Sequence, residues 1–149
     1  MIYGTSRATR VIVGRIEKGE LVHDTLLDLA RKENIRNGSV RGLGAFELAE
    51  LVEYDQKGKR FKPSQTFECA MEVLALVGNI TLKDNAPFAH LHAALSRELV
   101  RENNRIECLG GHLVSARAFA LELSIEVYED LVLERVPDEA TGLALWRCP

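Results

Sequence analysis

Three of the four histidines of this chain lie in two short motifs that could hold a metal ion, His90-Leu91-His92 and Gly110-Gly111-His112. In a β-strand, residues two apart point to the same face and lie roughly 6.6–6.8 Å apart. Two imidazoles at that spacing can lean together and share one ion, and a neighbouring strand can supply a third. Three neutral imidazoles suit Zn²⁺ best, with Ni²⁺, Co²⁺ or Fe²⁺ as alternatives, and leave a fourth position open. The pattern predicts a divalent-metal site at His90, His92 and His112.

A second interpretation remains open, because a His-x-His pair is also common on a solvated strand face without any metal. The sequence alone does not show that residues 90 and 112 are neighbours. Gly110-Gly111 lacks side chains, which favours a tight backbone turn beside the site. His23 stands alone near the start of a predicted helix, where a surface or capping role is expected.

The elements that must position these histidines are mainly strands. Residues 88–96 alternate, with both histidines of the first motif on one face. A second alternating segment follows His112, and its apolar residues Phe119, Leu121, Leu123, Ile125 and Val127 are expected to share a face. Residues 9–16 and 46–54 also favour strands. Residues 67–82 are apolar on both faces, which indicates a strand covered on both sides, with a bulge or bend at Gly78.

One strong amphipathic helix is predicted over residues 22–35, with Val22, Leu26, Leu29 and Ala30 in one stripe. Asn37-Gly38 is expected to end it. Turns are expected at residues 55–58 and 83–87, a loop at 97–105, and a last strand within Leu131–Val136. These elements predict an α/β fold of the α+β type, in which one main helix packs on a mixed, largely antiparallel twisted sheet.

Length and composition fit one domain, residues 1–149, with an aliphatic core. The chain has 149 residues, of which 46% are hydrophobic and 6% aromatic. Three cysteines without paired spacing argue against a disulfide framework. Cys69 is expected to be a small buried hydrophobe, and Cys148 to be exposed or docked near the end of the chain.

Charge and hydropathy limit the partners and the location. The formal net charge is −3 and no dense Lys/Arg run occurs, which disfavours binding to a polyanion. No apolar run approaches the roughly 20 residues that a membrane helix needs, and the first 20 residues lack the apolar core of a signal peptide. A cytoplasmic location without membrane contact is therefore expected.

The chain resembles the PPC family, the "plants and prokaryotes conserved" domain, in its prokaryotic stand-alone branch. The resemblance covers roughly residues 10–128, leaving 129–149 as a C-terminal tail. The motifs that carry it are Gly14-Arg15-Ile16 with Gly19-Glu20, the run from Asn37 to Ala45, His90-Leu91-His92, and Gly110-Gly111-His112-Leu113. It implies a mixed sheet with a flanking helix, a homotrimer, and a metal site, typically zinc, at His90, His92 and His112.

The family is often labelled DNA-binding, and its best-known plant members carry an AT-hook before the domain. That hook needs a Gly-Arg-Pro core to enter the narrow minor groove. This sequence contains no Gly-Arg-Pro, so direct DNA binding is in doubt here.

Three functions follow as hypotheses. The first is a homotrimeric metal-binding module that takes a small ligand or a protein partner. The second is a DNA-associated regulator without an AT-hook, whose basic patch would be formed by Arg7, Arg10, Arg41 and Arg117. The third is a zinc-dependent enzyme of unknown substrate, for which Glu98, Glu107 and Glu122 are candidate acids or bases. Ser96 and Ser115 lack a nucleophile motif.

Overall fold

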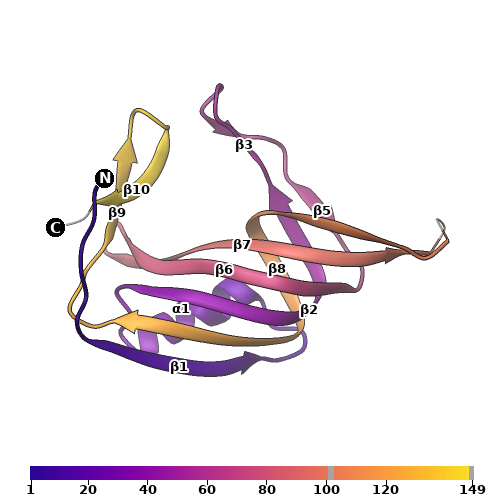
Figure 1. Cartoon of the computed structure of the whole chain (residues 1–149), viewed down its shortest axis with the longest axis horizontal. Helices are drawn as coiled ribbons and strands as arrows, with labels where there is room; N and C mark the ends of the chain where they lie inside the picture. The colour runs from indigo at the N-terminus through magenta and orange to yellow at the C-terminus, as the bar shows by residue number, and fades with distance from the viewer. Residues whose placement is uncertain (101–102, 148–149) are drawn as a thin grey trace.

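The computed structural model describes residues 1–100 and 103–147 as a strand-rich fold with a single α-helix among these residues (Figure 1). Cys148 lies outside the described residues. The helix α1 spans Val22–Lys32. The long strands are β1 (Thr9–Ile16), β2 (Gly38–Val52), β6 (Met71–Lys83), β7 (Ala86–Leu99) and β8 (Arg105–Tyr128). The short strands are β3 (Tyr54–Asp55), β4 (Arg60–Phe61), β5 (Gln65–Phe67), β9 (Glu134–Asp138) and β10 (Leu143–Arg147).

Four of the long strands form a closed ring. The order β6–β7–β8–β2 returns to β6, because β2 pairs with both β8 and β6. All of these pairings are antiparallel, and the parallel contact is the short one between β6 and β9. The expected mixed, largely antiparallel sheet with one helix is therefore confirmed.

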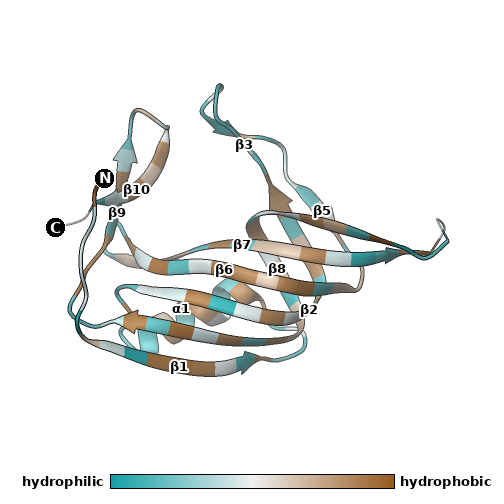
Figure 2. Cartoon of the chain, in the orientation of Figure 1, coloured by the Kyte–Doolittle hydropathy of each residue, from teal (hydrophilic) through white to brown (hydrophobic). Residues whose placement is uncertain are grey.

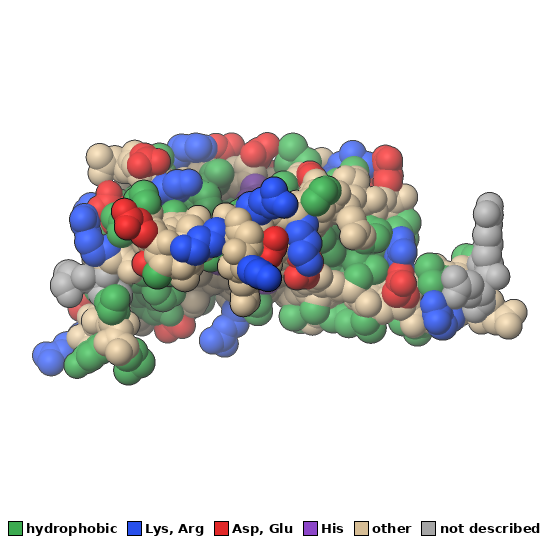
Figure 3. Space-filling model, turned by 90° about the horizontal axis from the view of Figure 1, so that it is seen from above, with side chains coloured by type: hydrophobic (Ala, Val, Ile, Leu, Met, Phe, Trp, Pro, Cys, Tyr) green, Lys and Arg blue, Asp and Glu red, His purple; other side chains and the backbone are tan. Residues whose placement is uncertain are grey.

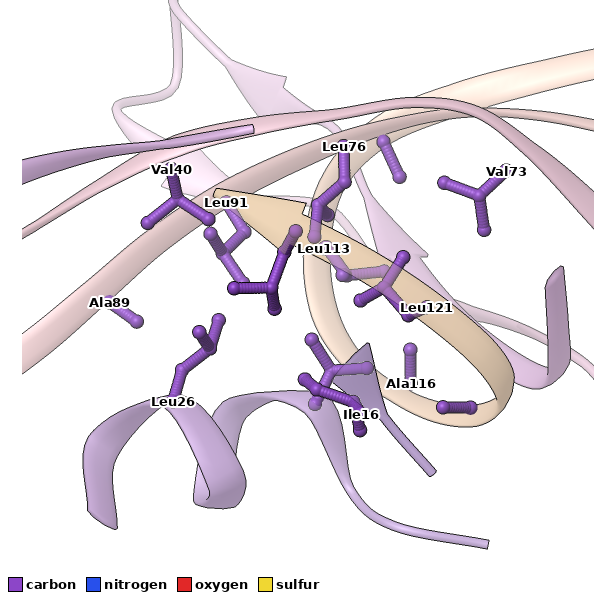
Figure 4. Close-up of a cluster of buried hydrophobic side chains, with 14 of the residues drawn as sticks. Ile16, Leu26, Val40, Val73, Leu76, Ala89, Leu91, Leu113, Ala116 and Leu121 are labelled. Carbon is purple, nitrogen blue, oxygen red and sulfur yellow. The ribbon is translucent and has the colours of Figure 1, made fainter. Parts of the chain in front are cut away.

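Hydrophobic residues recur along the long strands (Figure 2). The buried apolar side chains gather inside the ring and under the helix (Figure 4). Leu91 and Leu113 are fully buried there, and Leu26 of α1 and Ile16 of β1 close the cluster from the helix side. The apolar stripe of α1 makes this burial possible, and Asp24 in its first turn and Lys32 in its last suit the helix dipole.

The helix ends earlier than residue 35. Its last residue is Lys32, and Asn34 takes a positive φ of 51°. Ile35 is then buried, with its backbone N–H donating to the Ala30 carbonyl, and Gly38 already belongs to β2. The expected stop at Asn37-Gly38 was wrong because Asn34 supplies the left-handed residue three positions sooner.

Several strand details also differ from expectation. Residues 38–52 form one strand with bulges, which begins before the strand expected at 46–54. Strand β7 continues through Leu99 into the loop expected at 97–105. In β6, Leu74 and Val77 are exposed whereas Thr81 is buried beneath Arg135, so the outer face of that strand is covered over only part of its length. Phe119 was expected to share a buried face with Leu121 and the alternate residues that follow it. Register shifts between β2 and β8 instead turn Phe119 out of the core, and it is 53% exposed.

Gly78 serves close packing rather than a bulge. The register of β6 is continuous there, and a Cβ at residue 78 would lie 2.1 Å from the carbonyl oxygen of His90. The expected turn at 55–58 is present, with the Asp55 carboxylate accepting from the Lys57 and Gly58 backbone N–H groups. The turn at 83–87 is present too, with Asp84 and Asn85 at positive φ.

Two hairpins, β3–β4 and β9–β10, rise on the same side of β6 and β7 (Figure 1). Their tips are joined. The Tyr54 hydroxyl donates to the Thr141 carbonyl at 2.8 Å, and the Lys59 ammonium donates to the Glu139 carbonyl at 2.8 Å. We call this pair of contacts the hairpin clasp. Within the described residues, no helix combines the length and the apolar character needed to cross a membrane.

Candidate metal centre

Strand pairing brings the three histidines together on the outer face of the ring. His92 of β7 is directly opposite His112 of β8, and His90 precedes His92 by two residues on the same face. Leu91 and Leu113 point into the core instead, so their burial fixes the outward direction of the histidines. The fold therefore brings the two histidine motifs together, as predicted.

The separations suit a small metal ion. The Nε2 atoms of His90 and His92 are 3.2 Å apart, and one nitrogen from each of the three rings lies within 4.8 Å of the others. Zinc–nitrogen bonds of about 2.0–2.1 Å at a tetrahedral angle require nitrogens about 3.3 Å apart. His90 and His92 already have that spacing, and the His112 nitrogen lies within 4.8 Å of both.

The local electrostatics favour the neutral form of His90 and His112, which is the form that binds metal. Burial lowers the pKa of His90 to about 4, and the nearby charges of Arg135, His112 and His92 act in the same direction. Burial also lowers the pKa of His112, assisted by His92, His23 and Arg135. His92 is the exposed member of the cluster.

Arg135 holds His90 from behind. This β9 side chain is 7% exposed, and its Nη2 donates to His90 Nδ1 at 3.0 Å and to the Asn79 side-chain oxygen at 2.9 Å. Metal-binding histidines usually have an acceptor at this second nitrogen. A neutral imidazole that binds metal through Nε2 carries its proton on Nδ1, so metal binding at His90 requires the Arg135 Nη2 contact to lengthen.

The histidines form the floor of a pocket of about 430 Å³, which we call the histidine pocket. One wall comes from the β3–β4 hairpin with Tyr54 and Phe61, and the other from the β9–β10 hairpin with Leu143. The hairpin clasp joins the two walls. Figure 3 looks onto this side, where a histidine is visible in a hollow and Lys and Arg side chains lie around the opening.

The other residues singled out by the sequence lie elsewhere. Glu98 and Ser96 line a different pocket, Glu107 is paired with Arg97, and Glu122 is exposed on β8. These positions do not face the histidines, so sequence proximity was a wrong guide to an acid or base.

His23 is half-buried on α1 and caps no backbone group, since the helix has no side-chain cap. Gly110 and Gly111 lie within β8 rather than in a turn. A Cβ on Gly110 would lie 2.7 Å from the Ala93 carbonyl oxygen, so the residue allows close strand approach. Cys69 is half-buried against the core rather than fully buried, and Cys108 is exposed.

Two of the four arginines of the suggested basic patch form ion pairs with carboxylates. Arg10 forms ion pairs with Glu129 and Glu33, and Arg117 with Glu47 and Glu68. The backbone of Arg7 is bound to the Asp130 carboxylate, and Arg41 is exposed. Carboxylates therefore offset the positive charge at two of the four positions, Arg10 and Arg117, which weakens the patch that a phosphate backbone would need.

Sequence reasoning missed the residues that complete the histidine pocket, above all Arg135, Glu53 and Tyr54. They come from hairpins whose position over β7 depends on tertiary pairing. The segment containing Arg135 was expected as a last strand, and β9 confirms that in part, but its side chain gave no signal of burial.

Comparison with known proteins supports this description. Among curated proteins, none matches the chain. A plant- and prokaryote-conserved (PPC) protein from Pyrococcus horikoshii is 28% identical, with a TM-score of 0.85 and coverage of 99% of this chain and 97% of that one. A metal-containing protein from Archaeoglobus fulgidus is also 28% identical, with a TM-score of 0.83 and coverage of 99% and 98%.

A "putative DNA-binding protein" from Ralstonia eutropha is 25% identical, with a TM-score of 0.79 and coverage of 92% of this chain and 90% of that one. The sequence profile of the Plants and Prokaryotes Conserved (PCC) domain matches residues 3–129, a span that includes all three clustered histidines. The glycine and histidine motifs thus identified the family correctly, and the chain belongs to the Plants and Prokaryotes Conserved domain family.

Proposed function

We propose that this protein is a metal-dependent binding module in which His90, His92 and His112 hold one divalent ion, with Zn²⁺ the first choice. The observation that carries the proposal is the convergence of three imidazoles on the floor of a pocket. Burial favours the neutral forms of the His90 and His112 imidazoles. The similar protein from Archaeoglobus fulgidus is described as metal-containing, which supports the same role here.

A bound ion would keep an open coordination position toward the pocket, because the chain offers three imidazoles and zinc prefers four ligands. Tyr54, Phe61 and Leu143 surround that position and would exclude water from a bound ligand. The role of the chain's own residues is therefore to fix the ion and shape the space above it. A small ligand in this pocket is the function that the geometry supports best.

The test is metal analysis of protein purified without a histidine tag. We expect close to one Zn²⁺ per chain after equilibration, and loss of nearly all of it in His90→Ala and His92→Ala. His23→Ala is the matched control, because His23 lies on α1 outside the cluster, and it should keep its metal. Less than a tenth of an ion per chain in the unmodified protein, unchanged by His92→Ala, rejects the site.

A homotrimer is part of this proposal. The outer face of the sheet exposes several large apolar side chains, namely Val11, Val13, Leu43, Leu74 and Val77. Apolar groups of this kind favour association, and Val77 is directly opposite His92 in the strand register. An interface on this face would therefore place residues of a neighbouring chain near the pocket rim. Analytical ultracentrifugation should give three times the chain mass, and Val13→Lys should lower it; a monomer would reject the trimer.

An enzyme is the second candidate, favoured by the position of Glu53. Its Oε1 atom would lie 3.5 Å from a Cβ built on Gly111, so the carboxylate is beside the residue that precedes His112. A carboxylate next to an ion with an open position is a candidate general base. In a substrate screen, Glu53→Gln should abolish any chelator-sensitive turnover while metal content stays normal. Turnover that chelation leaves unchanged rejects this candidate.

A further inference from the structure

The histidine pocket contains a buried positive charge without a carboxylate partner. Arg135 is 7% exposed, and among the described residues no Asp or Glu forms an ion pair with it. Its neighbour in sequence, Glu134, pairs with Arg147 instead. An arginine keeps its charge when buried, and a buried charge is costly unless it is compensated. Arg135 is therefore a site where an anion would restore the balance.

Neutral groups hold the guanidinium in place. Nε donates to the Thr81 hydroxyl at 3.1 Å, Nη1 to the Ala144 carbonyl at 2.8 Å, and Nη2 to Asn79 and His90. A guanidinium has five N–H bonds, so one on Nη1 remains without an acceptor. Metal binding at His90 would release a second, on Nη2. The contacts fix the orientation of Arg135 and leave donor capacity for a ligand.

A second cation lies in the same wall. Lys83 of β6 is paired in register with Arg135 of β9 and also lines the pocket. The Lys83 ammonium lies 5.3 Å and the Arg135 guanidinium carbon 5.4 Å from the centre of the Phe88 ring. Glu53 is the one carboxylate among the described lining residues, and it forms no ion pair with either cation. A divalent ion would add two more positive charges to this pocket.

The rest of the lining is apolar and aromatic. Val52, Phe61, Leu143 and Leu145 face the same space of about 430 Å³. A free inorganic anion would leave these side chains in contact with water, whereas an organic acid would place its hydrocarbon part against them. The combination of a cationic wall and apolar surroundings is typical of a pocket for a small carboxylate.

We propose that the histidine pocket binds a small organic carboxylate, with the acid group between the bound metal ion and the Arg135–Lys83 wall and the hydrocarbon part against Phe61 and Leu143. This assignment rests on the proposed metal-binding function and names the ligand class for it. Arg135 and Lys83 are the residues that select the charge.

Calorimetric titration of zinc-loaded protein with isovalerate, its neutral analogue isovaleramide and inorganic phosphate tests the assignment. We expect isovalerate to bind about tenfold more tightly than isovaleramide, and phosphate to bind more weakly than isovalerate. Added salt should weaken isovalerate binding and leave isovaleramide unaffected. Equal affinities for the acid and the amide overturn the assignment, and tighter binding of phosphate replaces it with an inorganic-anion site.

Substitutions test which residues give the pocket its preference for the charged ligand. Arg135→Gln should abolish the preference for isovalerate over isovaleramide, with folding checked by circular dichroism. Lys83 is exposed, so Lys83→Gln should fold normally and still weaken isovalerate binding about threefold. Lys32→Gln, at the exposed end of α1, is the matched control and should change nothing. An unchanged preference in Lys83→Gln and in folded Arg135→Gln rejects the role of this wall.

The same titrations on metal-free protein separate the two proposals. If zinc does not bind but isovalerate is still preferred over isovaleramide, the metal-binding function fails while the charge selection stands. If zinc binds stoichiometrically and the preference is absent, the carboxylate assignment fails alone. Metal content is measured on each sample before titration, so the two outcomes are distinguishable.

Discussion

Two of the pockets of the molecule differ sharply in character. The larger, about 800 Å³ and here called the wide pocket, is lined by Glu47, Glu68, Glu72, Glu98 and Arg97, among others. Its charges are exposed or compensated, since Arg97 pairs with Glu107 and Glu47 with Arg117. The histidine pocket is about half that volume, yet it holds three imidazoles and a buried arginine without a counter-charge. Uncompensated polar groups, rather than volume, indicate where chemistry is built into a fold.

The largest effect is expected from Gly78→Ala, which acts on the strand beneath the histidine pocket. The new Cβ would lie 2.1 Å from the His90 carbonyl oxygen and 2.9 Å from Leu91 Cα, so backbone must move. We expect a loss of about 3 kcal/mol in the free energy of unfolding, measured by denaturant titration. Gly14→Ala is the control, because a Cβ there meets nothing within 4 Å. Equal stabilities would show that β6 and β7 can separate without cost.

Arginine replacement in each pocket compares the two directly. Arg135→Met would leave Thr81, Asn79 and the Ala144 carbonyl without their donor, and should cost about 2–3 kcal/mol. In the wide pocket, Arg97 is 26% exposed and pairs with Glu107, so Arg97→Met should cost less than about 1 kcal/mol. Thermal unfolding of both variants measures the difference. A larger loss from Arg97→Met would reverse the contrast between the pockets.

Acid should destabilise the metal-free protein through the histidine pocket. The folded-state pKa of His90 is about 4, against 6.5 for an ordinary histidine. Between these values the unfolded chain takes up a proton that the folded chain excludes, so stability falls as pH falls through this window and is unaffected above it. The pKa of His112, also lowered by burial, acts in the same direction. The drop in Tm from pH 7.5 to 4.5 should be smaller in His90→Gln; an equal drop would contradict this origin.

The smallest effect concerns the hairpin clasp, which the wide pocket lacks. Tyr54→Phe removes the hydrogen bond to the Thr141 carbonyl and should cost about 1 kcal/mol or less. Because the clasp joins the walls over the histidines, zinc should exchange with a chelator faster in the variant than in the unmodified protein. Tyr128→Phe, which loses a hydroxyl contact to Ser39 elsewhere, is the control. Identical exchange rates would mean that the clasp does not limit access.

Local patterns were enough for much of the fold. The alternation in residues 88–96 and the aliphatic stripe from Val22 to Ala30 each correspond to an element of the expected type. Those patterns reflect burial on one face of the element, and this burial is the same whichever strand or helix is its neighbour. They do not record which strands pair, so the bulges that turn Phe119 outward and join residues 38–52 into one strand were beyond them.

The residues of the candidate site also divide into those that local sequence patterns predicted and those that only tertiary pairing reveals. The spacing of His90 and His92 fixed their common face, and the family resemblance strengthened the prediction of His112 as the third ligand. The importance of Arg135 arises only when β9 aligns with β6, which places it opposite Lys83 and behind His90. Sequence neighbours of the histidines, such as Glu98 and Glu107, were instead carried to the wide pocket and its surroundings.

The closed ring of β2, β6, β7 and β8 has a consequence for how the protein folds. Its closing contacts join distant parts of the chain, for example Gly38 with Val127 and with Ile80. Such non-local pairing slows folding relative to helical proteins of similar size, because chain entropy is lost before the contacts form. The amide hydrogens around the three histidines should then exchange with solvent only through global opening, together with those of the core strands. Because His90, His92 and His112 all lie on the β7–β8 hairpin, metal capture would need the pairing of these two strands and could precede the closure of the ring by β2.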